Sequence, residues 1–126
     1  MAIAGELSPD ALAGYRDGAR RRQEAEQRAL AAREHQAWVL ARQAADLLRE
    51  QFQVERVAVF GSLVHPGCFT AWSDVDVAAW GLRPADTFRA IGLVMDLGGA
   101  IAVNLVDVGT CTASLLRVIE TEGVAP

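Results

Sequence analysis

Two short patterns in the sequence carry residue types suited to phosphate and metal chemistry. Residues 57–60 are apolar and run into Gly61 and Ser62, which is typical of a buried strand that ends in a tight turn. Glycine lets a phosphate approach the backbone closely, and the Ser62 hydroxyl can donate to it. Asp74 and Asp76 then open a second apolar run, and their spacing on a strand directs both carboxylates to one face.

This pair of carboxylates predicts a cation site. Two like charges side by side repel each other unless a cation lies between them. Mg²⁺ suits a site that has only oxygen ligands and that also receives substrate phosphates. We therefore expect Asp74 and Asp76 to bind metal, and Gly61 and Ser62 to bind nucleotide phosphates. The two patterns together indicate metal-assisted phosphoryl or nucleotidyl transfer.

The order of these patterns resembles the DNA polymerase β-type nucleotidyltransferase superfamily, and the short chain is similar to its minimal (MNT) branch. The likeness lies in residues 59–63, 69–77, 104–108 and 119–124, within roughly the last two thirds of the chain. It implies a nucleotidyltransferase fold of the α+β class, in which helices cover a small mixed β-sheet, here on one side, after a long N-terminal helix.

The third acidic position of the family is occupied differently in this chain. Relatives usually place a third aspartate on the next strand, and the resemblance puts Asn104 there. An asparagine amide oxygen can bind Mg²⁺, but the amide carries no charge and cannot accept the acceptor's proton. Asp107 lies three residues further on, so strand alternation turns it to the opposite face. We expect it there as a strand-end carboxylate in water.

His65 stands where many relatives carry an arginine in the phosphate loop. An imidazole that titrates near neutrality thus replaces a permanent charge. We expect His65 to contact the triphosphate, and an exposed loop histidine without such a role is the alternative. Trp72 and Trp80 flank the Asp pair, and we expect them in the core, with a base pocket as the alternative.

The resemblance implies a function as well as a fold. MNT proteins are commonly paired with a HEPN-domain RNase as a toxin–antitoxin module, in which the MNT member transfers AMP from Mg·ATP to a tyrosine hydroxyl of the toxin. The catalytic residues carried over are Asp74, Asp76 and Asn104, with Gly61, Ser62 and His65 toward the nucleotide. A catalytically weak antitoxin that acts by contact alone is one alternative. A small-molecule nucleotidyltransferase is another, although it would normally need a further domain for its acceptor.

Composition sets limits on the other function classes. The 126 residues carry a net charge of −4, with 52% hydrophobic and 22% charged residues, which fits one globular domain at residues 37–126 after a helical extension at residues 1–36. The acidic balance argues against direct nucleic-acid binding, which needs a basic stripe. No apolar run has membrane-spanning length and no signal peptide is recognised, so we expect a cytoplasmic protein with Cys68 and Cys111 as reduced thiols.

Periodicity and capping residues outline the elements. Ser8 is an expected helix N-cap, and no proline interrupts the chain from residue 10 to residue 51. We expect strands at residues 57–60, 75–80 and 101–108, and helices at residues 85–97 and 112–122. The expected inner face of the first of these two helices comprises Phe88, Ile91, Val94 and Met95. Residues 16–36 offer few apolar positions, so we expect them to make few contacts with their own domain and to serve a partner or a second copy.

Overall fold

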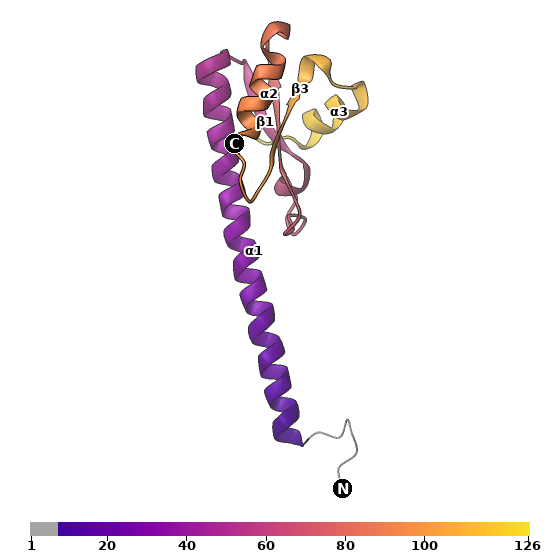
Figure 1. The fold of residues 1–126 in the computed structure, drawn as a ribbon. Helices are drawn as coiled ribbons and strands as arrows, with labels where there is room; N and C mark the ends of the chain where they lie inside the picture. Colours follow the sequence, from indigo (N-terminus) through magenta and orange to yellow (C-terminus); the bar gives the residue numbers. More distant parts are fainter. Residues whose placement is uncertain (1–7) are drawn as a thin grey trace. The chain divides into compact units, whose positions relative to one another are not determined.

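A computed structural model describes residues 8–126 and shows an α+β fold (Figure 1). Its main elements are α1 (Pro9–Phe52), β1 (Arg56–Phe60), β2 (Val75–Trp80), α2 (Thr87–Met95), β3 (Val103–Asp107) and α3 (Ala113–Glu122). Short 3-10 helices at Gly61–Val64, Pro84–Asp86 and Val108–Thr110 lie between them. The expected fold class, a small mixed sheet with helices and a long N-terminal helix, is confirmed.

The chain divides into two compact units, residues 1–32 and residues 33–126, and α1 contributes to both. We expected this division after residue 36. In the first unit, every residue from 8 to 32 is exposed or half-buried. The second unit contains the sheet, the core and all residues of the candidate site. Within residues 8–126, no helix is both long enough and apolar enough to span a membrane.

Helix ends follow the capping residues. The Ser8 hydroxyl oxygen accepts a hydrogen bond from the Ala11 N–H at 3.1 Å, at the start of α1. The Thr112 hydroxyl oxygen accepts from the Leu115 N–H at 3.2 Å at the start of α3, which ends before Gly123. The expected N-cap at Ser8 and the expected end of the last helix at residue 122 are therefore confirmed.

The sheet is mixed and has the strand order β1-β2-β3. β1 pairs with β2 in the antiparallel direction, with Phe60 opposite Asp76. β2 pairs with β3 in the parallel direction, with Asp76 opposite Asn104. The central strand β2 therefore carries Asp76 between the end of β1 and the start of β3.

Helices cover both faces of the sheet, so the expectation of helices on one side only is wrong. On one face, Val59 and Val77 pack into the main core, which includes buried side chains of α1 and α2 such as Leu48 and Val94. On the other face, Phe60 and Ala78 form a second cluster with Ile119 of α3. Successive residues of β1 point to opposite faces of the sheet, and residues 57–60 are all apolar. Both faces of the strand are therefore apolar, and each has to be covered.

Three large side chains expected inside lie at the surface instead. Phe88 and Met95 are 89% and 56% exposed, because Thr87 begins α2 after a 3-10 turn and the buried positions of this helix are Ala90 and Val94. Trp72 is 91% exposed, on a turn in which the Ser73 hydroxyl oxygen accepts from the Thr70 N–H at 2.9 Å. Trp80, by contrast, is half-buried and packs against the second cluster.

Asp107 faces away from Asn104, as predicted, but it is not in water. Its side chain points to the α2 side of the sheet and the residue is only 5% exposed. The Thr87 hydroxyl donates to Asp107 Oδ2 at 2.7 Å, and the Gly109 N–H donates to Oδ1 at 2.9 Å. The carboxylate thus joins the start of α2 to the end of β3.

Replacing Asp107 with alanine is expected to lower the free energy of unfolding by about 1–3 kcal/mol. The substitution leaves the Thr87 hydroxyl and the Gly109 N–H without their acceptor in a buried place. Urea unfolding followed by circular dichroism measures the loss. Asp96→Ala is the matched control because Asp96 is exposed, and its effect should stay within about 0.5 kcal/mol. Equal losses in both variants would show that the buried hydrogen bonds contribute little.

Candidate active site

Asp74, Asp76 and Asn104 come together at one end of the sheet. Asp76 is the second residue of β2, and Asn104 is the second residue of β3. The parallel register places these two residues directly opposite each other, so their side chains share a face. Asp74 immediately precedes β2 and reaches the same place. The neighbours Val75 and Val103 alternate into the core, which holds this orientation.

The Asn104 amide lies between the two carboxylates. Its Nδ2 donates to Asp74 Oδ2 at 3.3 Å and to Asp76 Oδ1 at 3.4 Å. Both bonds are long for N–H···O hydrogen bonds. Ionised carboxylates can only accept, so the amide presents its NH₂ group to them. The predicted convergence of Asp74, Asp76 and Asn104, with Asp107 elsewhere, is confirmed as geometry.

The environment of Asp76 disfavours its negative charge. Burial raises the pKa of Asp76, the hydrogen bond from Asn104 opposes this increase, and the charge of Asp74 adds to it. Asp74 itself is exposed. Burial is the largest of these effects, and repulsion from Asp74 is the smallest.

Gly61 packs directly against Asp76 at the end of β1. Its φ is +78°, a left-handed conformation that favours glycine. A Cβ at this position would lie 2.6 Å from Asp76 Oδ2, so the Asp76 carboxylate would have to shift to make room for it. Ser62 follows in the same 3-10 helix and is half-buried. The glycine thus brings the turn of the expected phosphate loop into contact with the carboxylate cluster.

His65 pairs with an acidic residue from the other end of the domain. Its Nε2 lies 3.0 Å from Glu122 Oε2, and the two side chains are 44% and 40% exposed. The contact joins the end of the 3-10 helix at Gly61–Val64 to the last turn of α3. A phosphate that binds His65 would have to displace this carboxylate or lie beside it. No local pattern could have indicated Glu122, which is 57 residues away.

Arg33 is a positioning residue that sequence reasoning missed. Its Nε donates to the Thr70 carbonyl at 3.2 Å and its Nη2 donates to the Ser73 carbonyl at 3.1 Å. Its Nη1 donates to the Ala100 carbonyl at 3.3 Å. These carbonyls belong to the segments that lead into β2 and β3. The expectation that residues 16–36 make few contacts with their own domain is therefore wrong at Arg33.

The donor set of the cluster fits Mg²⁺. Two carboxylates converge with an amide that can offer Oδ1 in place of Nδ2, which makes an oxygen-only set, and Mg²⁺ is often held by one or two carboxylates together with substrate phosphates. Across residues 8–126, no three or more His, Cys, Asp and Glu side chains are grouped to hold a metal ion. The cluster instead consists of two acidic residues and Asn104.

No family model matches the chain, and no curated protein matches it. We therefore base the functional proposal on Gly61, Asp74, Asp76 and Asn104 and on the order in which the chain presents them.

Substitution of Gly61 by alanine is expected to destabilise the fold more than the same substitution at Gly67. Both glycines have positive φ, +78° and +77°, so both variants carry a similar backbone strain of about 1–2 kcal/mol. Only at Gly61 does the new Cβ meet Asp76, whereas nothing lies within 4 Å at Gly67. Urea unfolding should show an additional loss of about 1–3 kcal/mol for Gly61→Ala. Equal losses would mean that Gly61 does not pack on the carboxylate.

Asp76→Asn is expected to stabilise the chain at neutral pH in the absence of divalent cations. The pKa of Asp76 is higher in the folded state than its usual value of 3.8, so ionised Asp76 opposes folding at pH 7. This penalty decreases as the pH falls through the raised pKa and vanishes below 3.8, where both states are protonated. Thermal unfolding at pH 7 and near pH 3 tests this. An advantage of Asp76→Asn that persists at the lower pH would contradict it.

Proposed function

We propose that the chain is a nucleotidyltransferase-fold antitoxin that transfers AMP from Mg·ATP to a tyrosine hydroxyl of a HEPN ribonuclease. The observation that carries the chemistry is the convergence of Asp74, Asp76 and Asn104 beside Gly61. The partner comes from the family resemblance alone. The net charge of −4 suits docking to a basic ribonuclease surface.

Each residue of the cluster has a distinct task in this proposal. Asp74 and Asp76 would hold Mg²⁺, and Asn104 would add its amide oxygen. Bound there, the cation would neutralise charge on the phosphates and at the α-phosphorus. Gly61 and Ser62 would receive the β- and γ-phosphates on backbone N–H groups and the serine hydroxyl.

The transfer step also needs a proton acceptor. The acceptor hydroxyl oxygen forms a bond to the α-phosphorus of ATP, the bond from that phosphorus to the bridging oxygen breaks, and pyrophosphate leaves. The hydroxyl proton cannot go to Asn104, because an amide is not a base at neutral pH. Asp74 and Asp76 would both be occupied as Mg²⁺ ligands, so neither is assigned as the base. Solvent beside the exposed Asp74 would take the proton.

A contact-only antitoxin is the second candidate, and two observations favour it. The uncharged Asn104 already donates to both carboxylates, so the cluster is satisfied in part without a cation. His65 is already paired with Glu122. In this alternative the domain binds the toxin, and the carboxylate cluster retains nucleotide without turning it over.

Asn104→Asp separates the two candidates. The substitution adds a third carboxylate, which supplies an anionic ligand and a base, so AMP transfer should rise by about 10²- to 10⁴-fold. The assay follows label from α-labelled ATP to a HEPN ribonuclease encoded beside this chain, at fixed Mg²⁺. Asp74→Asn in the same assay is the negative control and should remove the labelling.

Thermal unfolding provides a readout that does not depend on the partner. Asn104→Asp should lower the melting temperature without Mg²⁺, because three carboxylates then repel one another, and should increase the stabilisation that Mg²⁺ provides. Strong labelling that Asn104→Asp leaves unchanged would place residue 104 outside the site. No labelling by either chain, together with a stable complex, would establish the contact-only antitoxin. If Mg²⁺ does not stabilise the chain and no complex with the ribonuclease forms, both candidates are overturned.

A further inference from the structure

A contact between His65 and Glu122 lies at the end of the expected phosphate loop. The atoms His65 Nε2 and Glu122 Oε2 are 3.0 Å apart, and both side chains are partly exposed. An ionised carboxylate only accepts hydrogen bonds, so the imidazole is the donor. Phosphate oxygens accept from imidazole N–H groups in the same way. Glu122 therefore uses a donor that also suits a phosphate.

The 3-10 helix at Gly61–Val64 sets His65 on the same side as Ser62. The His65 N–H donates to the Ser62 carbonyl at 3.3 Å, which is the bond across three residues that defines such a helix. Side chains three residues apart are eclipsed in this geometry. Leu63, between them, is buried in the main core. The Ser62 hydroxyl and the His65 imidazole therefore lie together on the side that faces away from the core.

The packing of α3 holds the backbone at Glu122 in place without the help of His65. Val124, two residues further on, exchanges two hydrogen bonds with Val59 of β1, at 2.7 and 2.8 Å. Glu122 itself stands in the last turn of α3, where the helix dipole disfavours a carboxylate. The contact with His65 can therefore open by rotation of one side chain, while the helix stays where it is.

We propose that Glu122 occupies the phosphate position on His65 in the absence of nucleotide and is an internal competitor that the nucleotide displaces. The inference rests on the proposed function, because it takes Ser62 and His65 as ligands of the β- and γ-phosphates. A carboxylate and a phosphate on one imidazole repel each other, so one excludes the other. A triphosphate that is also held through Mg²⁺ at Asp74 and Asp76 would displace Glu122, whereas a lone phosphate has no such second anchor.

Removal of the Glu122 charge tests the competitor. Isothermal titration calorimetry measures the affinity of the full-length chain for tripolyphosphate with Mg²⁺ at about pH 6, where an ordinary imidazole is mostly charged. Glu122→Gln should bind about three- to tenfold more tightly than the unmodified chain, because the competing charge pair and one repulsive charge are removed.

Glu120→Gln is the matched control for net charge. It makes the same change two residues away, about 200° around α3 from Glu122. Its affinity for tripolyphosphate should stay within about twofold of that of the unmodified chain, because exposed charges away from the ligand are screened by salt.

A double-mutant cycle with His65→Ala assigns the effect to the contact. Without the imidazole there is no donor for Glu122 to occupy, so Glu122→Gln should gain no more than Glu120→Gln in this background. Urea unfolding followed by circular dichroism checks that every variant folds. The exposed pair should contribute little to that stability.

Histidine NMR gives a readout that does not depend on a measured affinity. The chain contains two histidines, His35 and His65, so the spectrum of His35→Gln assigns the His65 imidazole resonance. Tripolyphosphate with Mg²⁺ should shift the His65 resonance and leave the His35 resonance unchanged. In Glu122→Gln, the same shift should be complete at a lower concentration of tripolyphosphate.

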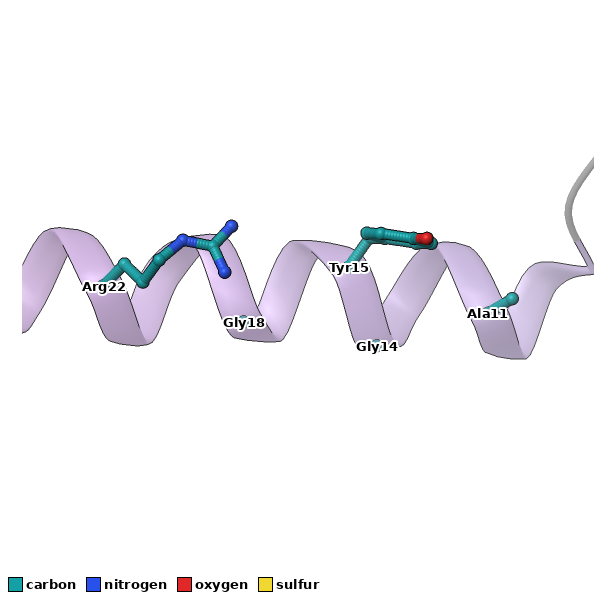
Figure 2. Close-up of a pocket in the computed structure, with 5 residues that line it drawn as sticks. All are labelled: Ala11, Gly14, Tyr15, Gly18 and Arg22. Carbon is teal, nitrogen blue, oxygen red and sulfur yellow. The ribbon is translucent and has the colours of Figure 1, made fainter. Parts of the chain in front are cut away.

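Tripolyphosphate could also bind arginines of α1, and a second control addresses this. Arg22 lines a shallow groove on α1 in the first unit (Figure 2), and Arg20 and Arg21 precede it in the sequence. The triple variant Arg20→Gln/Arg21→Gln/Arg22→Gln should keep both the binding and the gain from Glu122→Gln. Loss of binding in this variant would place the anion on α1 and overturn the inference.

The outcomes separate this inference from the proposed function. Weaker binding by Glu122→Gln would make Glu122 a support for the imidazole. An unchanged affinity, an equal gain in Glu120→Gln, or a gain that persists with His65→Ala would remove its role as a competitor. Each of these results overturns the inference and leaves the proposed function standing. If neither the unmodified chain nor any variant binds tripolyphosphate with Mg²⁺, both are overturned.

Discussion

The parallel pairing of β2 with β3 is the constraint on which the candidate site depends. Its register sets Asp76 opposite Asn104, and the alternation of side chains sends Val77 and Leu105 from the same strands into the main core. A slip of one residue would exchange the two faces and would place Asp76 in the main core. The packing of the core therefore also fixes the geometry of the polar cluster, and Arg33 adds a second link between the segments that precede the two strands.

Much of the site could be predicted because it depends on residues that are close together in the sequence. Asp74 and Asp76 share a face because of the two-residue period of a strand, and Ser8 and Thr112 act as helix caps through contacts within three residues. Other features depend on residues far apart in the chain. The covering of the second sheet face by α3, the hydrogen bond of Asp107 with Thr87 and the pairing of His65 with Glu122 follow from tertiary packing. The helical phase of α2 was missed because a 3-10 turn shifts its start, which turned Phe88 outward.

An asparagine at position 104 balances two opposing effects, the stability of the cluster without a cation and its attraction for one. A third carboxylate would increase the attraction for a cation but would also increase the repulsion within the protein when no cation is bound. An amide offers an N–H donor to the two aspartates in one orientation and an oxygen ligand in the other. Under the proposed function, the chain would therefore fold without a metal and would still offer a weak site for one.

Arg33 connects the segments before β2 and β3 through a single side chain. Its guanidinium donates to carbonyls of Thr70, Ser73 and Ala100, and the Val75 N–H donates to the Ala102 carbonyl at 2.9 Å nearby. A planar fork with several donors suits this task, and a lysine ammonium would not reproduce it. The two segments therefore share one anchor. They should open to solvent as one cooperative unit in hydrogen exchange, at a rate set by the release of one arginine rather than by either loop alone.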